Sequence, residues 1–282
     1  MTGRPGWLPH AIENGSENGC VPEGDTVWLT AKRLNSALAG QLLCTFDLRV
    51  PTLATVDRRG DHVQSVLARG KHLLVRLDSE LTLRSHLRMD GSWRLSPAGG
   101  ATPGPRHQVR AILGNAQWQA TGLRLHDLAI VPTAAEHTLV GHLGPDLLGP
   151  DWSADRAVEL LRQEPNREIG DAIMDQRNLA GIGNLYKSET LFLRGVDPWT
   201  PVGLVDDLNA LVTRAQVLLN ANKQHPEQST TGLLARGQQH WVYLRANEPC
   251  RRCRTPIQQS MQGRPGQERS TYWCPHCQPS VA

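Results

Sequence analysis

The chain has 282 residues, 39% of them hydrophobic, and a formal net charge of +3. This length allows two domains with buried cores, but the charge is too small to indicate a nucleic-acid partner unless basic residues cluster locally. No apolar run approaches the roughly 18–20 residues that span a bilayer, and residues 1–20 lack the apolar segment of a signal peptide. We therefore expect a cytoplasmic protein without a membrane partner, and a disordered tail over residues 1–20.

The first half of the chain predicts one helix followed by short strands. Asp25 can cap a helix, and apolar residues then recur at helical spacing until Gly40, which predicts a helix over 25–39. From 42 to about 131, short segments with frequent apolar–polar alternation are separated by Gly, Pro and Asp turns. This pattern is typical of an antiparallel β-domain.

The second half changes to helical periodicity after a connection rich in Pro and Gly at residues 142–152, which is the candidate domain boundary. A strand is predicted at 239–244 and a polar loop at 225–232. The predicted helices cover 154–163, 167–175, 184–194 and 204–222.

Four of the six cysteines form two C-x-x-C pairs near the end of the chain: Cys250, Cys253, Cys274 and Cys277. This spacing is typical of a structural zinc site with four thiolates in a tetrahedron, and zinc binding would supply the folding energy of so small a segment. A redox or disulfide pair and an iron–sulfur centre are the alternatives. Residues 245–269 also hold six arginines against two glutamates, which favours phosphate contacts over an ordinary solvated surface.

A Gly-Ile-Gly turn at 181–183 comes directly before the helix that opens at Asn184. The free N–H groups of such a helix start, with the Asn184 amide, can hold an anion, and against DNA they would clamp a phosphate. The alternative is a tight helix–helix connection with Asn184 as its cap.

Four blocks, in this order, resemble the formamidopyrimidine-DNA glycosylase/endonuclease VIII family. They are PEGD (22–25), RGKHLL (69–74), DQ-x3-AGIGNLY (175–186), and EPC-x2-C with RSTYWCP-x-CQ (248–278). The resemblance covers roughly residues 22–278, and the Pro-Glu-Gly start is closer to the endonuclease VIII branch.

The resemblance implies an α+β fold with an N-terminal helix and an antiparallel β-sandwich. A helical helix–two-turn–helix domain with a zinc-finger β-hairpin follows. The implied boundaries are 22–141 for the catalytic β-sandwich domain, 150–244 for the helix–two-turn–helix domain and 245–279 for the zinc finger. Residues 1–21 form an extension that we expect to be absent from the working protein.

The implied activity is that of a bifunctional DNA glycosylase and AP lyase of base-excision repair, with oxidised pyrimidines as the expected bases. The secondary amine of an N-terminal Pro22 would attack C1′ of the damaged nucleotide and form a Schiff base, and β- or β,δ-elimination would cut the strand. Glu23 would act as general acid, Lys71 would assist the sugar chemistry and bind phosphate, and Arg269 would hold the phosphate beside the lesion.

Pro22 is internal in this sequence, and a peptide nitrogen with a delocalised lone pair cannot form an imine. Val21 occupies the position of the family's initiator methionine, and a GUG codon is read as Met when it starts translation. Removal of that methionine would expose Pro22. The alternatives are a catalytically inactive damaged-DNA-binding protein whose extension blocks Pro22, and an unrelated zinc-ribbon nucleic-acid binder.

Further DNA contacts follow from the same resemblance. Arg88, Met89 and Asp90 align with the loop that fills the gap left by a flipped base, although Met89 could instead pack in the core. His142 and Asn184 align with DNA-contacting positions.

The family often has a glutamate at the position of Thr26, so Asp25 is the candidate for a second carboxylate near the site. The shortness of the 225–232 loop makes a large lesion-capping lid of the purine-specific type doubtful. The expected partner is damaged double-stranded DNA, with single-stranded DNA left open. The expected cofactor is one structural Zn²⁺, in a monomer associated with a bacterial-type nucleoid.

Overall fold

The computed structural model describes residues 21–280, so the expectations for residues 1–20 lie outside the described part. The chain divides into two compact units. Thr30–Leu67 and Leu73–Ala134 belong to the first unit, while Pro22–Leu29, Ala68–His72 and everything from Ala135 onward belong to the second. The segments that carry Pro22, Glu23 and Lys71 therefore group with the C-terminal half of the chain.

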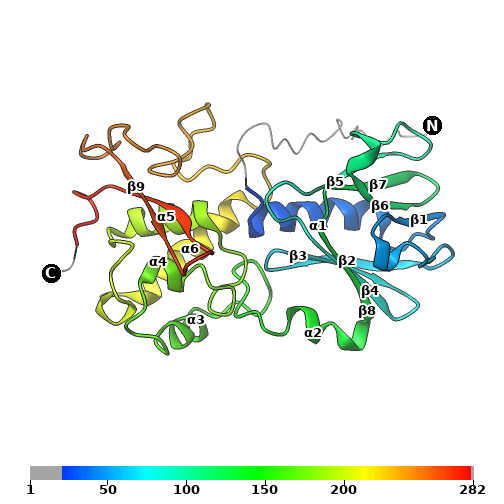
Figure 1. Ribbon diagram of the computed structural model, residues 1–282, viewed down its shortest axis with the longest axis horizontal. Coiled ribbons are helices and arrows are strands. Elements are labelled where there is room, and N and C mark those ends of the chain that lie inside the picture. The colour runs from blue at the N-terminus through cyan, green and yellow to red at the C-terminus, as the bar shows by residue number, and fades with distance from the viewer. Residues whose placement is uncertain (1–20, 281–282) are drawn as a thin grey trace, which may run out of the picture. The chain divides into compact units, whose positions relative to one another are not determined.

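The predicted first helix is confirmed as α1 (Gly24–Leu38), which begins one residue earlier than expected. Leu34 and Leu38 on this helix are fully buried. The residues after it form two four-stranded sheets, coloured blue to green in Figure 1.

One sheet has the order β1-β6-β7-β5 and is antiparallel throughout, with a register shift between Val109 and Ala111. The other has the order β2-β3-β4-β8, with β4 and β8 antiparallel. The strands are β1 (Thr45–Leu48), β2 (Val63–Arg69), β3 (His72–Leu77), β4 (Leu81–His86), β5 (Ser92–Pro97), β6 (Val109–Gly114), β7 (Trp118–Leu123) and β8 (Asp127–Pro132). Short 3-10 turns are η2 (Pro51–Leu53), η3 (Arg106–Gln108) and η4 (Thr133–Ala135).

The second unit is helical and ends in a β-hairpin. Its elements are α2 (His137–Val140), α3 (Ala154–Leu161), α4 (Ile169–Ala172), α5 (Asn184–Arg194), η5 (Val202–Leu204), α6 (Leu208–Asn222), β9 (Gln258–Gln262) and β10 (Arg269–Trp273). The predicted bounds of α5 are confirmed, and Gly195 ends this helix in the left-handed conformation at φ 69°. Helix α6 begins later than predicted because the side chain of Asp207 caps it by accepting from the N–H of Ala210.

The predicted strand at 239–244 is wrong. The backbone N–H groups of Trp241, Val242 and Tyr243 all donate to the buried carboxylate of Glu189, each at 2.8 Å. A strand would need those N–H groups for a neighbouring strand. The apolar residues of this segment mark core positions, since Val242 and Tyr243 are both buried.

The helical segment predicted at 167–175 is shorter than expected, because only Ile169–Ala172 is helical. Among the described residues, no helix is both long and apolar enough to cross a membrane.

Candidate active site and metal centre

The carboxylate of Glu23 binds the start of helix α5. Glu23 is 0% exposed. Its Oε2 accepts from the N–H of Gly183 at 2.7 Å, and its Oε1 accepts from the N–H of Leu185 at 2.8 Å. The free donors of a helix N-terminus favour an anion, and here that anion belongs to the protein. The N–H groups of Gly183 and Leu185 are therefore not free to hold a DNA phosphate.

Glycines allow the segment around Glu23 and the turn before α5 to approach closely. The N–H of Gly24 donates to the carbonyl oxygen of Gly181 at 2.8 Å. A Cβ on Gly183 would lie 2.4 Å from Cδ of Glu23, and a Cβ on Gly24 would lie 3.0 Å from Cα of Gly181. The PEGD and GIGN blocks, about 160 positions apart, thus form one site through direct backbone contact.

Burial raises the pKa of Glu23 from 4.5 to about 7. The charge of Lys71 opposes this rise, and the charge of Asp25 adds to it. Burial lowers the pKa of Lys71; the charge of Glu23 counteracts this, while that of Arg269 lowers it further. A carboxyl group with a pKa near 7 can both give and take a proton at neutral pH.

Asp25 supplies a second buried carboxylate. It is 2% exposed, and burial raises its pKa. The hydroxyl of Tyr186 donates to its Oδ2 at 2.6 Å, and Nε2 of Gln228 donates to its two oxygens at 2.9 and 3.0 Å. Sequence reasoning missed both partners. Tyr186 lies in a recognised block, but nothing distinguishes Gln228 within its polar loop.

Lys71 lies in the turn between β2 and β3. Residues of the 142–152 connection bind this turn. The N–H of Gly70 donates to Oδ2 of Asp146 at 2.7 Å, and Arg69 pairs with Asp151 at 2.7 Å. Two carboxylates of the connection thus fix the residues that precede Lys71, which explains why this turn belongs to the second unit.

Two predicted DNA contacts lie elsewhere in the second unit. His142 is exposed, and its ring meets the ring of His72 edge to face with centroids 6.4 Å apart. Asn184 is the first residue of α5, and the cap position before it is Gly183. The Nδ2 of Asn184 donates to the carbonyl oxygen of Ser270 at 2.7 Å. Asn184 therefore anchors β10 directly beside Arg269, which is exposed.

The loop residues Arg88, Met89 and Asp90 belong to the first unit, in the turn between β4 and β5. Arg88 has a φ of 51° and donates its N–H to Nδ1 of His86 at 2.9 Å. Met89 is 61% exposed, so the alternative that it packs in the core is wrong.

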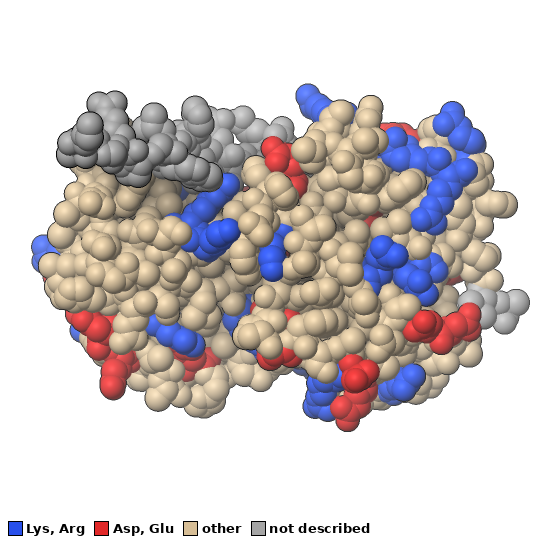
Figure 2. Space-filling view, turned by 180° about the vertical axis from the view of Figure 1, so that it is seen from behind, with Lys and Arg blue, Asp and Glu red and all other residues tan. Residues whose placement is uncertain are grey.

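Three of the six arginines in residues 245–269 make contacts within the protein. Arg245 donates to Glu248 at 2.9 Å, Arg251 donates to the carbonyl oxygen of His240 at 3.0 Å, and Arg252 lies over the ring of Phe192 at 4.4 Å. Basic and acidic side chains are interspersed on the face that Figure 2 shows. The charge count of 245–269 therefore overstates the surface free to meet phosphates.

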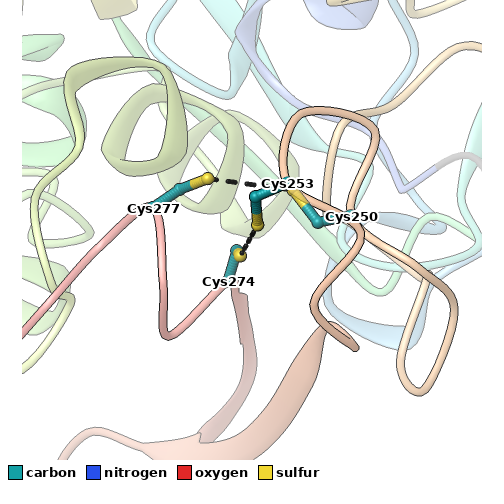
Figure 3. A group of neighbouring side chains, drawn as sticks. All are labelled: Cys250, Cys253, Cys274 and Cys277. Carbon is teal, nitrogen blue, oxygen red and sulfur yellow. Dashed lines mark hydrogen bonds between the residues drawn. The ribbon is translucent and has the colours of Figure 1, made fainter.

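The four predicted metal ligands converge at the base of the hairpin (Figure 3). Their Sγ atoms all lie within 4.8 Å of one another. The Sγ atoms of Cys250 and Cys277 lie 3.9 Å apart, and those of Cys253 and Cys274 lie 3.4 Å apart. Both distances are too long for a disulfide bond. A tetrahedron of sulfurs about 2.3 Å from one ion places them about 3.8 Å apart, so this cluster can hold a metal ion.

Two family profiles match the chain. The formamidopyrimidine-DNA glycosylase N-terminal domain matches residues 21–129, and the formamidopyrimidine-DNA glycosylase H2TH domain matches residues 143–232. The chain is also 54% identical over 265 residues to a probable endonuclease 8 2 of Streptomyces coelicolor, covering 93% of this chain and 95% of that protein. It is 45% identical to the DNA-(apurinic or apyrimidinic site) lyase Nei2 of Mycolicibacterium smegmatis, covering 92% and 99%.

Solved structures share the fold. The Lactococcus lactis formamidopyrimidine-DNA glycosylase, crystallised with DNA that contains an AP site, superposes with a TM-score of 0.77 at 22% identity. That match covers 92% of this chain and all of the other. The expected fold class is thereby confirmed.

Proposed function

Because the chain belongs to the formamidopyrimidine-DNA glycosylase family, in its endonuclease VIII-like branch, we propose that it is a DNA glycosylase and AP lyase of base-excision repair. One observation carries this proposal. The carboxylate of Glu23, directly after Pro22, is buried on the start of α5 with a pKa of about 7, within the fields of Lys71 and Asp25. Family membership also rules out the alternative of an unrelated zinc-ribbon protein.

In the proposed reaction, the free secondary amine of Pro22 forms a bond to C1′ of the damaged nucleotide. The glycosidic bond breaks, and the base leaves with the bonding electrons and takes up the proton that the Pro22 nitrogen releases. Glu23 donates its proton to the ring oxygen as the C1′–O bond opens, which leaves an iminium on Pro22. Loss of a C2′ proton then expels the 3′ phosphate by β-elimination, and a second elimination can expel the 5′ phosphate.

This chemistry requires that Pro22 be the first residue of the working chain. Two observations support that start. The N-terminal family profile begins to match at residue 21, and Nei2 of M. smegmatis is matched over 99% of its length by 92% of this chain. Initiation at codon 21, followed by methionine removal, would produce the required amine.

The proposed substrate is duplex DNA that carries an oxidised pyrimidine. Lys71 and Arg269 would hold phosphates at the lesion, and His142 and Asn184 would contact the backbone nearby. Exposed Met89, with Arg88 and Asp90, would enter the gap left by the extruded nucleotide.

The proposed ion of the four-cysteine cluster is one structural Zn²⁺. When bound, it would cross-link the two C-x-x-C turns in a closed tetrahedral site. Cys250 and Cys274 are buried, so the ligands themselves form part of the core beneath the hairpin. The hairpin in turn positions Arg269 at the first residue of β10.

Borohydride trapping tests the proposed function. A chain that begins at Pro22 should form a covalent adduct with DNA containing an oxidised pyrimidine, whereas the 282-residue chain and a Pro22→Gly variant should trap at least about 100-fold less. If the shorter chain binds lesion DNA but never traps, the proposed glycosylase and lyase activity is wrong, and the extension is not the cause of the inactivity. Equal trapping by the 282-residue chain would show that another amine is the nucleophile.

A further inference from the structure

A pocket of about 430 Å³ lies in the second unit, outside the cluster of Glu23 and Asp25. Its walls come from the segment around α4, from α5 and from the β9–β10 hairpin. Lys187 contributes from α5, and Arg264 and Arg269 contribute from the hairpin. Arg269 is the residue proposed above to hold the lesion phosphate, so the pocket adjoins the proposed DNA site.

The charges on the two sides of this pocket differ. On the α4 side, Arg167 pairs with Asp171 at 2.6 Å and with Asp175 at 3.0 Å, and Arg177 pairs with Asp175 at 2.6 Å. Those arginines are neutralised by the protein, and so are the two carboxylates.

The other side has no such compensation. Within residues 21–280, no carboxylate forms an ion pair with Lys187, Arg264 or Arg269. Nζ of Lys187 donates to Oγ1 of Thr271 at 2.6 Å, and Arg269 donates to the carbonyl oxygen of Glu268 at 3.1 Å. Three basic side chains therefore line one wall, and these hydrogen bonds of Lys187 and Arg269 go to neutral acceptors.

Lys187 is the most buried of these three basic residues, since it is only 2% exposed. Burial lowers its pKa from 10.5 to about 7. The charges of Glu23 and Asp171 oppose this shift, and the charge of Arg269 adds to it. Two cations that disfavour each other beside a pocket create a site that an anion would stabilise.

We propose that this pocket is a phosphate subsite of the DNA-binding surface, where a backbone phosphate lies against Lys187, Arg264 and Arg269 and Lys187 takes up a proton as the phosphate enters. This inference rests on the proposed function for its ligand, because DNA is the polyanion that such an enzyme binds. The subsite extends the contact of Arg269 to a wall that α5 supplies.

The direction of the proton linkage follows from the charges. A phosphate beside Lys187 favours the ammonium, so the pKa of Lys187 is higher in the complex than in the free protein. The contribution of Lys187 to affinity is then complete below about pH 7, and it is lost as the pH rises through the value in the complex. Binding near neutral pH should therefore consume a fraction of a proton per complex.

Calorimetric titration of the protein with duplex DNA that contains a tetrahydrofuran abasic analogue tests this. The analogue has no base to excise and no aldehyde to form an imine. Titrations at pH 7.5 in two buffers of different ionisation enthalpy give the protons taken up. The wild type should take up more protons than Lys187→Met and Lys187→Arg, and Lys187→Arg should keep its affinity.

The salt dependence provides a second measurement. Lys187→Met should lose about tenfold in affinity, and the slope of log K against log salt should fall by about 0.7–0.9, as expected for one lost phosphate contact. Arg214→Gln is the matched control for charge, because Arg214 is exposed on α6 and does not line the pocket. It should leave proton uptake unchanged.

Equal proton uptake by wild type and both Lys187 variants would overturn the proposal. If inorganic phosphate alone gives the Lys187-dependent uptake and the DNA does not, the pocket is a free-phosphate site, which also contradicts it. Thermal unfolding of Lys187→Arg shows whether the variant is folded. Failure of borohydride trapping on lesion DNA would overturn the proposed enzyme activity, but it would not affect this binding measurement.

Discussion

Two buried glutamates are associated with helix α5 and differ in what they bind. Glu189, on the helix, accepts the N–H groups of residues 241–243 and the hydroxyl of Thr230. Glu23 accepts the N–H groups at the start of the helix. Both are 0% exposed.

The two glutamates differ in the charged residues that surround them. Glu189 orders a segment of the protein, and its oxygens are fully occupied by donors. Glu23 lies beside Asp25 and Lys71, whose charges act on it in opposite directions, and burial brings its pKa to about 7. Backbone N–H contacts alone therefore do not distinguish a candidate catalytic carboxylate from a structural one, whereas a coupled set of titratable groups does.

The largest expected effect separates these two carboxylates. Glu23→Gln should reduce base excision by at least about 100-fold, because it removes the transferable proton. Glu189→Gln should leave the activity of the folded fraction near that of the wild type, yet lower stability by about 1–3 kcal/mol through weakened buried hydrogen bonds. Single-turnover kinetics and thermal unfolding measure the two quantities. Similar loss of activity in both variants would break the comparison.

Metal removal tests the region that Glu189 helps to order. A strong chelator, or Cys253→Ser, should release one zinc per chain and disorder the hairpin that carries Arg269. DNA binding should weaken by more than tenfold, while the first unit keeps its structure. Metal analysis, circular dichroism and binding titrations check this. Unchanged DNA binding after complete metal loss would contradict the structural role of the site.

Gly183→Ala should displace Glu23 without changing its chemistry. The added Cβ would lie 2.4 Å from Cδ of Glu23, so the carboxylate must move. We expect a roughly tenfold to hundredfold loss of excision, of the size that misplacement of a catalytic group produces. Gly100→Ala is the control, because that glycine is exposed and its added Cβ would meet only the carbonyl oxygen of Pro97, at 3.1 Å. Full activity in Gly183→Ala would show that the position of Glu23 is not critical.

The last expected effect is on stability rather than activity, and it depends on pH. The pKa of Glu23 is 4.5 as an ordinary group and about 7 in the folded protein. Glu23 therefore favours folding most below pH 4.5, and this contribution is lost as the pH rises to about 7, by up to about 3 kcal/mol. Thermal unfolding should show Glu23→Gln gaining stability relative to wild type between pH 5 and pH 8. An equal difference at both pH values would contradict the buried, protonated state.

Helix α5 and the four-cysteine cluster could be predicted from the sequence, because each rests on a local signal. The helical periodicity predicted α5, and the two C-x-x-C pairs predicted the cluster in Figure 3. The partners of the site depend on contacts between distant segments, which leave no local pattern. Gln228, 203 positions from Asp25, is one example, and Asp146, which holds the turn before Lys71, is another.

The wrong predictions also arise from contacts between segments that are distant in the sequence. The N–H groups at the start of α5 looked free because their acceptor, Glu23, lies about 160 positions earlier. Residues 239–244 looked like a strand because the alternation of buried residues does not reveal that Glu189 takes their N–H groups.

The most direct test of the central claim is to locate the covalent bond to DNA. A chain that begins at Pro22 is incubated with abasic-site DNA and borohydride, then digested and mapped by mass spectrometry. We expect a reduced sugar adduct on the N-terminal nitrogen of Pro22. An adduct on Lys71 or on another lysine, with Pro22 unmodified, would contradict it.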